Sequence, residues 1–549
     1  MSLKNVNTFT WKIVGESGFG ISTLGILFSK IASRSGFYVF GYSEYPSLIR
    51  GGHQTSQVSV DLGPVYGARR SVDILLGLNR DSLARHVGEL SRGAAVLFDS
   101  SQYTLHSAKS QIGLKVKDMI MFLVPFTELA VENAGLNIMS NMIALGSSLQ
   151  LLGFGLEVAE DLIGEMYPDT REQNISALRA GYSYIQEHYE VLSQTFAYKR
   201  SGQAPLLSKP YVMTGIEALG LGAIAGGLIF YLGYPTTPSS TLMSFMAEHQ
   251  YDNGYVVRQA EDEISVINMA IGASFAGARV LVATSGGGVA LMSESLGFAA
   301  ISEISITVIN CQRPGPGTGL PTWTDQGDLR SVLHVAHGEF LRVVIASGDL
   351  EKCYVGIVNS LNLAEEFQIP VFVLSDKYLS EFHSLLETMP DACSISRGKL
   401  VITSEGLEVA VGQEYLRYET TNDGVGVRTI LGVMGGIFLA NSNRHDERGF
   451  SSEESDVRVE QVDGQPCVTF NQVNTYEWFK EMVYVLESPL EKITSAIEMV
   501  HEQEGMPLGV IYQSRESEDY VSQLTHITPS SLVENVSSRD VSHIAKRFQ

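Results

Sequence analysis

Three short runs of mostly apolar residues recur in the middle of the chain, separated by segments rich in glycine and alanine. They are RVLVA at 279–283, ISITVI at 304–309 and VFVL at 371–374. Strands buried on both faces have this continuous apolar pattern, whereas a strand with one solvated face alternates apolar and polar residues. The pattern therefore predicts a parallel β-sheet covered by helices on both faces, which is the doubly wound α/β arrangement.

The beginning of the chain has a similar order of elements. A strand-like run at 10–14 precedes the glycine turn GESGFG at 15–20, and a helical pattern at 21–33 leads to a second apolar run at 37–42. A strand, a helix and a strand in this order are typical of a βαβ unit. Further strand–helix alternation follows, so another doubly wound α/β domain is expected here.

The length of 549 residues exceeds the size at which one hydrophobic core stops growing, so about three domains are expected. Between the two regular regions the sequence loses its periodicity and contains glycine, proline and serine, which is typical of a linker. The predicted organisation is an α/β domain at 1–195, a linker at 196–210, a second α/β domain at 211–388 and a third, smaller α/β domain at 389–549.

The composition is strongly acidic. Lys and Arg total 38 against 61 Asp and Glu, which gives a formal net charge of −23. Such a charge repels nucleic-acid phosphates and anionic membrane surfaces, so neither is an expected partner. The most apolar stretch, at 218–234, is shorter than the roughly 20 residues that span a bilayer, and the first residues show no export signal. We therefore expect a cytoplasmic protein.

The cysteines argue against a metal centre held by this chain alone. Cys311, Cys353, Cys393 and Cys467 are isolated, and no two of them form a C-x-x-C pair. Zinc sites and iron–sulfur clusters need closely spaced thiolate ligands. We therefore interpret the four cysteines as reduced thiols in the core or on the surface.

A glycine turn and a glycine-containing loop are the candidate features of the first domain. The turn GESGFG precedes a helix, where free N–H groups and the helix dipole favour an anion. Its spacing is not the dinucleotide fingerprint, and a purely structural turn would have the same sequence. The loop EYPSLIRGGH at 44–53 fits a surface that faces a cofactor or another subunit. The candidate residues are Gly15, Gly18, Gly20, Arg50, Gly51 and Gly52.

Four loops of the second domain concentrate residues that bind ligands or act as acids and bases. They are YPTTPSS at 234–240, EDE at 261–263, TSGGG at 284–288 and QRPGPGTGLPT at 312–322. The last two follow predicted strands, at the place where open α/β sheets bind ligands. Each loop also has a simple structural explanation, because Ser and Thr cap helices and acidic residues complement the helix dipole. Four such loops in one domain favour a ligand site over four ordinary turns.

The order and spacing of these loops resemble the α subunits of 2-oxoacid:ferredoxin oxidoreductases. The resemblance also rests on the run EISVINMAIGASFAGAR that begins at 263, on LMSE at 291–294, on TWTDQGDL at 322–329 and on HGE at 337–339. The first domain is similar to the γ domain that many of these enzymes fuse ahead of α, so the resemblance covers residues 8–450. It implies that the central domain is a thiamine pyrimidine-binding domain.

The resemblance implies an enzyme that decarboxylates a 2-oxoacid oxidatively with thiamine diphosphate and CoA, and that reduces ferredoxin. The motif TGLPT, at 318–322, is typical of the branch that acts on 2-oxoglutarate and forms succinyl-CoA. The sequence lacks both the GDG…NN motif that holds Mg2+ with the diphosphate and a cysteine set for a 4Fe-4S cluster. Both are therefore expected on a β subunit, in an α2β2 heterotetramer that is active only when complete. The glycine loops of the first domain are candidates for contacts with CoA or with that subunit.

The functional residues of the family transfer to matching positions of this chain. Glu263 matches the glutamate that bonds the aminopyrimidine ring and so promotes loss of the thiazolium C2 proton. Thr237 matches the hydroxyl near the reacting carbonyl of the substrate, and Arg313 matches the cation that receives its carboxylate. Thr322 resembles a selector of the distal end of the substrate. The residues expected to contact the cofactor are Tyr234, Pro235, Ser285, Gly286 and Gly287, and no metal-binding residue is expected.

Departures from the family pattern leave alternatives open. The chain has GGG at 286–288 where the family commonly has GPG, and it lacks the expected basic run after residues 445–449. The third domain is therefore expected to be divergent or truncated, and residues 525–549 carry no prediction. The alternatives are the same enzyme acting on pyruvate or branched-chain 2-oxoacids, and a non-catalytic paralogue that binds the β subunit.

Overall fold

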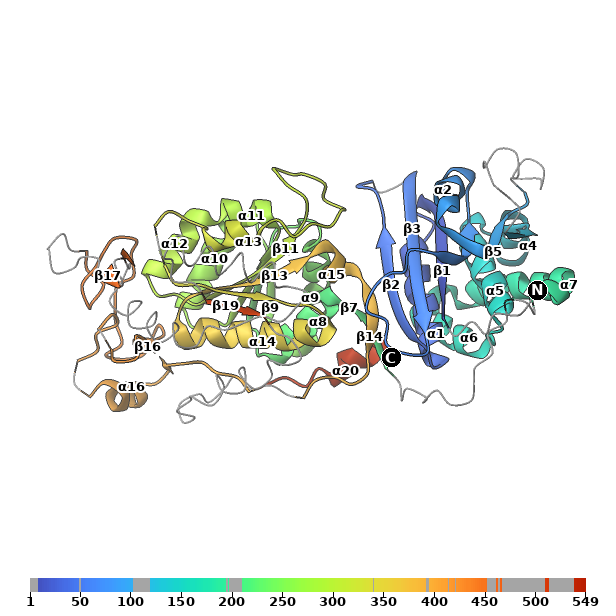
Figure 1. The fold of residues 1–549 in the computed structure, drawn as a ribbon. Coiled ribbons are helices and arrows are strands. Elements are labelled where there is room, and N and C mark those ends of the chain that lie inside the picture. Colours follow the sequence, from blue (N-terminus) through green and yellow to red (C-terminus); the bar gives the residue numbers. More distant parts are fainter. Residues whose placement is uncertain are drawn as a thin grey trace. The chain divides into compact units, whose positions relative to one another are not determined.

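The computed structural model describes residues 8–48, 51–101, 119–193, 196, 210–338, 340–391, 394–412, 414–419, 421–451, 461–462, 465–466, 509–512 and 538–549. The chain divides into two compact units (Figure 1). Unit 1 comprises Met1–Thr214, Glu381–Met389 and Ala545–Gln549, and unit 2 comprises Gly215–Ser380 and Pro390–Ile544. Each unit is described by itself below.

Unit 1 is built on one mixed sheet. Its strands are β1 (Thr8–Ser17), β2 (Tyr38–Glu44), β3 (Gly51–Asp61), β4 (Val72–Gly77), β5 (Leu90–Asp99), β6 (Ile120–Val124), β7 (Tyr211–Thr214) and β14 (His383–Leu386). They form an eight-stranded sheet in the order β6-β5-β4-β1-β3-β2-β14-β7. The strands from β6 to β1 are parallel, and β3 runs antiparallel to both β1 and β2.

Helices cover both faces of the unit 1 sheet. They are α1 (Ile21–Arg34), α2 (Arg80–His86), η1 (Val87–Glu89), α4 (Phe126–Ala134), η3 (Asn137–Met139), α5 (Ser140–Leu152), α6 (Glu157–Met166), η4 (Pro168–Thr170), α7 (Arg171–Ser193) and η5 (Lys546–Phe548). Alternate residues of β1 serve the two faces: Trp11 and Ile13 join the large cluster with α1 and α5, whereas Val14 joins a smaller cluster with Leu83 of α2. This alternation follows from the two-residue period of a strand.

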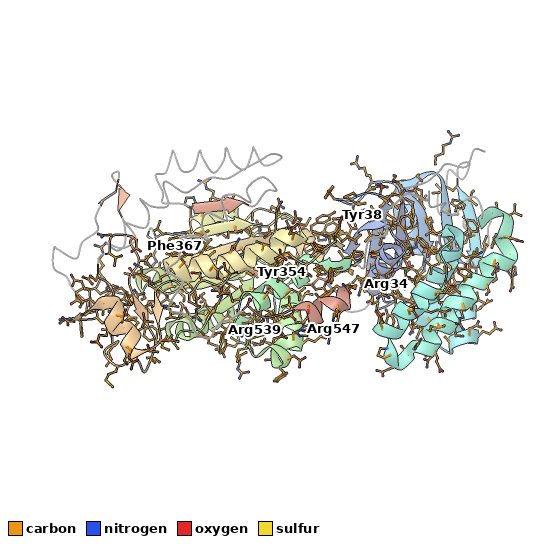
Figure 2. The ribbon with its side chains drawn as sticks, turned by 90° about the horizontal axis from the view of Figure 1, so that it is seen from below. Arg34, Tyr38, Tyr354, Phe367, Arg539 and Arg547 are labelled. Atoms are coloured by element: carbon orange, nitrogen blue, oxygen red, sulfur yellow. The ribbon has the colours of Figure 1, made fainter. Side chains whose placement is uncertain are left out.

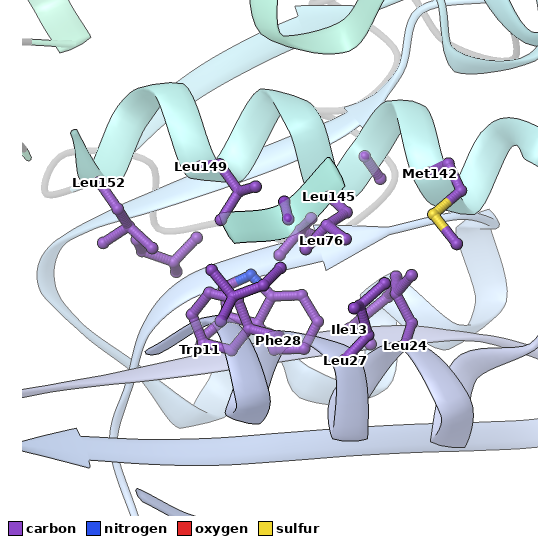
Figure 3. Close-up of a cluster of buried hydrophobic side chains, with 14 of the residues drawn as sticks. Trp11, Ile13, Leu24, Leu27, Phe28, Leu76, Met142, Leu145, Leu149 and Leu152 are labelled. Carbon is purple, nitrogen blue, oxygen red and sulfur yellow. The ribbon is translucent and has the colours of Figure 1, made fainter. Parts of the chain in front are cut away.

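The core of unit 1 centres on an aromatic stack. Trp11 and Phe28 lie 4.4 Å apart between ring centroids with planes only 12° from parallel, and both side chains are fully buried. Leucines from α5, including Leu145 and Leu149, face this stack (Figure 3). The indole N–H of Trp11 donates to Ser148 Oγ at 3.1 Å, so the polar atom of the buried ring is satisfied.

Strand β14 brings a distant part of the sequence into the unit 1 sheet. It pairs antiparallel with β2 and with β7. Its His383 is buried and lies 2.8 Å from Ser29 Oγ of α1, over Gly41 of β2. A side chain at position 41 would overlap the imidazole, so glycine is required there. The last turn of α1 is also bound from far along the chain, because Arg34 (Figure 2) donates from Nε to the Gln549 carbonyl at 3.0 Å.

The predicted opening of the chain is present, with one difference. β1, α1 and β2 occupy the predicted positions, and β1 and β2 are parallel to each other because both are antiparallel to the intervening β3. The prediction of a surface loop at 44–53 was wrong for its last residues, because Gly51 and Gly52 begin β3. Buried serines and threonines in β3 give it no apolar pattern, which is why it was not predicted. Arg50 lies outside the described residues.

Unit 2 contains a wholly parallel sheet. Its strands are β8 (Phe230–Gly233), β9 (Val256–Gln259), β10 (Val280–Thr284), β11 (Ile306–Gln312), β12 (Val343–Ala346), β13 (Pro370–Asp376) and β19 (Gly509–Tyr512). Seven strands follow the order β19-β12-β13-β11-β10-β8-β9, and every pair is parallel. The three apolar runs of the sequence are β10, β11 and β13, which confirms the predicted α/β fold with parallel strands.

The helices that the structure describes in unit 2 either connect the strands of its sheet or lie in the segments that follow them. They are α8 (Gly215–Ala225), α9 (Ser240–Asn253), α10 (Glu263–Phe275), α11 (Gly286–Leu291), α12 (Ser293–Ile301), α13 (Leu329–Leu333), α14 (Leu350–Phe367), α15 (Lys377–Glu381), α16 (Ser404–Val411) and α20 (Ser542–Ala545). From β8 the chain moves to β9 on one side and then crosses to β10 on the other. The strand order therefore reverses at β8, and the loops on its two sides diverge. Open α/β sheets bind ligands in the crevice at such a point.

The segment after Pro390 is attached to α14 by buried charges. Glu365, near the end of α14 that carries Phe367 (Figure 2), lies within 3.1 Å of Arg279, 2.5 Å of Arg397 and 3.5 Å of Arg428. Two short sheets follow, formed by β15 (Leu400–Val401) with β16 (Arg428–Thr429) and by β17 (Gln461–Val462) with β18 (Gln465–Pro466). Most of the expected third domain lies outside the described residues, and the domain boundaries predicted from the sequence remain a proposal. None of the helices in the described ranges has the length and hydropathy needed to cross a membrane.

Candidate functional site

The loops predicted to form a site meet at the carboxyl ends of β8, β9, β10 and β11. Two adjacent threonines after β8 join them. The Thr236 hydroxyl donates to Glu263 Oε1 at 3.2 Å, and the Thr237 carbonyl accepts from Arg313 Nη1 at 2.6 Å. The structure therefore brings together Thr237, Glu263 and Arg313, which come from three different loops.

Glu263 is not needed as a helix cap. The residue before it, Asp262, caps α10 by accepting from the Ser265 N–H at 2.7 Å, and these hydrogen bonds lower the pKa of Asp262. Glu261 is exposed, whereas Glu263 is only 7% exposed. Asp262 therefore fills the capping position of α10. Capping does not explain why a second carboxyl group, that of Glu263, is buried beside it, and this leaves Glu263 for another role.

Glycines in the first turn of α11 allow two carboxyl groups to approach the backbone. A Cβ on Gly288 would lie 2.9 Å from Glu263 Oε1, and a Cβ on Gly286 would overlap the Asp328 carboxylate. Gly287, between them, has only the Gly317 carbonyl nearby, at 3.8 Å. The glycine turn TSGGG therefore lies between the Glu263 and Asp328 side chains.

Asp328 was not among the residues predicted from the sequence. It accepts from Asn310 Nδ2 at 3.2 Å, and its own N–H donates to Gln312 Oε1 at 3.0 Å. Burial raises the pKa of Asp328, and the nearby Arg313 opposes this shift. The signal in the sequence was its place in the TWTDQGDL segment, directly before a helix.

Arg313 lies in a partly buried and acidic environment. Burial lowers the pKa of its guanidinium, while Glu263 and Asp328 act in the opposite direction. Within the described residues, the Arg313 guanidinium donates a hydrogen bond to the Thr237 carbonyl. This bond uses one of the five N–H donors of the guanidinium. Donors therefore remain for an anionic group in the crevice.

Several buried polar atoms beside the glycine turn have no hydrogen-bond partner among the described residues. They are Thr284 Oγ1, Ser285 Oγ and Asn310 Oδ1. Ser285 precedes α11 without capping it through its side chain. Buried polar atoms are normally satisfied, so these three mark a place where a ligand would complete the hydrogen bonding.

The remaining predicted residues of unit 2 with defined surroundings are half-buried or exposed. Tyr234 packs partly against the unit 2 core, and Pro235 is exposed. Thr322 is half-buried, and its hydroxyl makes no hydrogen bond within the part of the chain that the structure describes. The loop returns to the sheet at Asp376 of β13, which accepts from Thr324 Oγ1 at 3.3 Å and from Gln326 Nε2 at 2.6 Å.

The glycine turn of unit 1 has a different environment. Gly18 and Gly20 have φ of 104° and 67°, values that favour glycine, and Gly20 precedes α1. The Gly15 carbonyl accepts from Ser82 Oγ at 3.0 Å, and this hydroxyl also lies 2.8 Å from His53 Nδ1. Polar contacts thus link the Gly15 carbonyl to Ser82 and His53. Among the described residues, these contacts bring no Lys or Arg side chain to the turn.

Comparison with known proteins now decides the family. A domain described as "Pyruvate flavodoxin/ferredoxin oxidoreductase, thiamine diP-bdg" matches residues 221–464, and one described as "Pyruvate ferredoxin/flavodoxin oxidoreductase" matches 10–184. The alpha subunit of 2-oxoacid:ferredoxin oxidoreductase 2 from Aeropyrum pernix is 31% identical over 81% of this chain and 76% of its own length. The chain belongs to the 2-oxoacid:ferredoxin oxidoreductase alpha subunits.

Two further relatives have names that include a substrate. The 2-oxoglutarate oxidoreductase subunit KorA of Mycobacterium tuberculosis is 30% identical over 66% of this chain and 60% of its own. The structure of 2-oxoglutarate:ferredoxin oxidoreductase from Magnetococcus marinus, with 2-oxoglutarate, coenzyme A and succinyl-CoA bound, superposes with a TM-score of 0.74 at 24% identity over 99% of this chain and all of that one. The second match shows a shared fold.

The family assignment confirms that this alpha subunit is part of an oxidoreductase acting on 2-oxoacids and contains a thiamine diphosphate-binding domain. A third domain, the C-terminal domain of the pyruvate ferredoxin oxidoreductase beta subunit, matches residues 467–528, a relationship that was not predicted from the sequence. Most of that segment lies outside the described residues.

The residues of the alpha subunit fit the pyrimidine half of thiamine diphosphate. A buried carboxylate, Glu263, faces a glycine turn whose missing side chains leave backbone accessible, and unpartnered hydroxyls lie beside it. Among the described residues, no three His, Cys, Asp or Glu side chains are grouped to hold a metal ion.

Proposed function

We propose that this alpha subunit supplies the pyrimidine side of a thiamine diphosphate site, with Glu263 as the group that activates the cofactor. The observation that carries the proposal is the Glu263 carboxylate, buried against Gly288 at the crevice and hydrogen-bonded by Thr236. Thiamine diphosphate supplies a nucleophilic carbon for attack on a 2-oxoacid. Glu263 would hold a proton between its carboxyl group and the aminopyrimidine ring, while Ser285, Gly286 and Gly287 contact the ring.

The substrate would bind across the same crevice. Arg313 has unused guanidinium donors and a planar shape that suits a carboxylate, so it would receive the 2-oxoacid carboxylate. Thr237 would lie near the reacting carbonyl, and Thr322 would contact the distal end. Tyr234 and Pro235 would border the cofactor.

We propose 2-oxoglutarate as the substrate and succinyl-CoA as the product. The TGLPT segment at 318–322 supports this, as do the names of the KorA relative and of the Magnetococcus marinus enzyme. Pyruvate and branched-chain 2-oxoacids are the alternatives, since Thr322 offers only a small hydroxyl for discrimination.

The complete enzyme would need a beta subunit, in an α2β2 assembly in the cytoplasm. That subunit would hold Mg2+, the diphosphate and the 4Fe-4S cluster, because the sequence of this chain has neither a GDG…NN motif nor clustered cysteines. Ferredoxin would accept the electrons. CoA or the beta subunit would meet the glycine loops of unit 1, at Gly15, Gly18, Gly20, Arg50, Gly51 and Gly52.

The second candidate function is a non-catalytic paralogue that binds the beta subunit, which the altered GGG turn favours. Co-expression of the chain with its partner distinguishes the two. The purified complex is assayed for CoA-dependent reduction of a viologen dye with 2-oxoglutarate, 2-oxobutyrate and pyruvate. Turnover that is highest with 2-oxoglutarate is expected, and a stable complex without turnover would establish the paralogue.

A further inference from the structure

Asp328 is a carboxylate beside the glycine turn to which the proposed reaction gives no role. It follows the loop that begins with Arg313, and its side chain packs against the Gly286 backbone. Asn310, which is fully buried at the end of β11, donates to its carboxylate. Gln312, also buried, accepts from its N–H and in turn donates to the Ser375 carbonyl at 3.2 Å. These bonds fix the carboxylate on one side of the glycine turn.

The opposite side of the same turn holds Glu263, which packs against Gly288. Two carboxylates therefore flank a single helical turn whose three residues have no side chains. Both carboxylates act to raise the pKa of Arg313, and its guanidinium donates to the Thr237 carbonyl at 2.6 Å. In the described part of the chain it forms no ion pair with either carboxylate, so it keeps donors for a ligand.

We propose that Asp328 is a positioning residue that acts through Arg313: its charge partly offsets that of the guanidinium, so that the substrate carboxylate is held less tightly. This inference rests on the proposed function. A carboxylate on the far side of the glycine turn lowers the net positive charge that an anionic substrate meets at Arg313.

The charge of Asp328 limits how tightly Arg313 holds the substrate carboxylate. The negative charge of Asp328 repels an anion bound at Arg313, so removing that charge should strengthen binding. The other charged groups around Asp328 are Asp325 on its own loop and Arg313, and α11 presents only glycine to it. Loss of the Asp328 charge should therefore lower KM, whereas loss of local structure should raise it.

The experiment compares Asp328→Asn with wild type in the complete complex with the beta subunit. Asparagine keeps the size of the side chain and an acceptor for Asn310, so only the charge is lost. The KM for 2-oxoglutarate is expected to fall about five- to tenfold, the effect of one charge several ångströms away in a partly buried site. The kcat is expected to fall as well, because the substrate carboxylate is then held more tightly in the ground state than in the transition state.

A pH series separates charge from shape. The difference in KM between the variant and wild type should vanish at low pH, where Asp328 of the wild type is protonated and neither protein carries the charge. The dissociation constant of glutarate, a dicarboxylate that cannot react, is measured by calorimetry over the same pH range and should follow KM. The matched control is Asp325→Asn, which removes the same charge from an exposed position in the loop and should leave both constants within about twofold.

The outcomes are distinct. An increase or no change in KM and in the glutarate constant for Asp328→Asn, in an active complex, would overturn the role of Asp328 alone. A KM difference that persists unchanged to low pH would also overturn it, since shape would then be the cause. A wild-type complex inactive with all three 2-oxoacids would overturn the proposed function and this inference together.

Discussion

Gly288 and Glu263 are so close that a single methyl group cannot be placed between them. A Cβ on Gly288 would stand 2.9 Å from Glu263 Oε1 and would overlap Thr284 Oγ1. The turn that replaces the family GPG with GGG therefore keeps the glycine on which the carboxylate depends. Its middle position, Gly287, would bring a Cβ only into ordinary contact with the Gly317 carbonyl, at 3.8 Å.

Gly288→Ala should destabilise unit 2 by about 1–3 kcal/mol, because the site is buried and overpacked. The variant should also lose activity as the Glu263 carboxylate is pushed from its place. Chemical denaturation measures the first effect. The control is Gly272→Ala, in α10 with nothing within 4 Å of its Cβ, where alanine should stabilise the helix by about 1 kcal/mol. Equal stability of the two variants would show that the turn relaxes freely.

Glu263→Gln should leave assembly with the beta subunit intact and slow turnover by about 10²–10⁴-fold, because the amide cannot exchange a proton with the aminopyrimidine ring. Exchange of the thiazolium C2 proton, followed by NMR in the complex, should slow in parallel. Glu261→Gln is the control, since Glu261 is exposed at the start of the same helix and its carboxylate only meets Ser265 Oγ at 3.3 Å. Rapid C2 exchange in Glu263→Gln would assign the role to another residue.

Arg313→Ala and Thr322→Ala should have separable effects, because the two residues are proposed to meet opposite ends of the substrate. Loss of a charged hydrogen bond costs about 1.5–3 kcal/mol, so Arg313→Ala should lower kcat/KM for every 2-oxoacid alike. Thr322→Ala should change the preference between 2-oxoglutarate and 2-oxobutyrate and leave pyruvate nearly unaffected. The assignment of ends would be wrong if Arg313→Ala affected 2-oxoglutarate alone.

Acid should weaken unit 1 through His383. Burial lowers the pKa of His383 to about 4 from 6.5, so the folded state binds fewer protons than the unfolded state between these values. Stability from this group is complete above pH 6.5 and is lost as the pH falls towards 4, by about 3 kcal/mol at most.

Urea unfolding at about pH 7.5 and about pH 5 measures this loss, and His383→Gln should reduce the difference between the two curves. Glutamine retains a polar atom for Ser29 and cannot gain a proton. His53, whose pKa is lowered to about 4 mainly by burial, contributes in the same direction and remains in the variant. An unchanged pH dependence in His383→Gln would show that His383 does not titrate with unfolding.

Sequence patterns predicted the fold where burial is continuous. β10, β11 and β13 are buried on both faces, so their residues are apolar throughout and recognisable. β3 was missed because it buries Thr55, Ser56 and Ser59 instead. Strand β9, with only four residues and two of them exposed, carries too little pattern to be recognised.

The site was predicted by resemblance, and its missing member shows what spacing cannot reveal. Asp328 reaches the glycine turn across space, from a residue far along the chain, and no local pattern records that contact. The two adjacent threonines make a similar point. Thr237 was predicted to place its hydroxyl near the reacting carbonyl of the substrate. Within the protein its carbonyl accepts from Arg313, and the hydroxyl that donates to Glu263 belongs to Thr236, which was not predicted. The conformation of the loop backbone decides which group of each threonine meets which partner, and the order of residues in the sequence does not reveal it.

The place of β14 in the unit 1 sheet has a consequence for biosynthesis. β14 separates β2 from β7, although it is translated long after both. While the ribosome is making unit 2, β2 is therefore an unpaired edge strand. Its exposed N–H and C=O groups can pair with strands of other nascent chains. A fragment ending at residue 214 would keep that edge permanently, so chaperone dependence should be greater for the fragment than for the full chain.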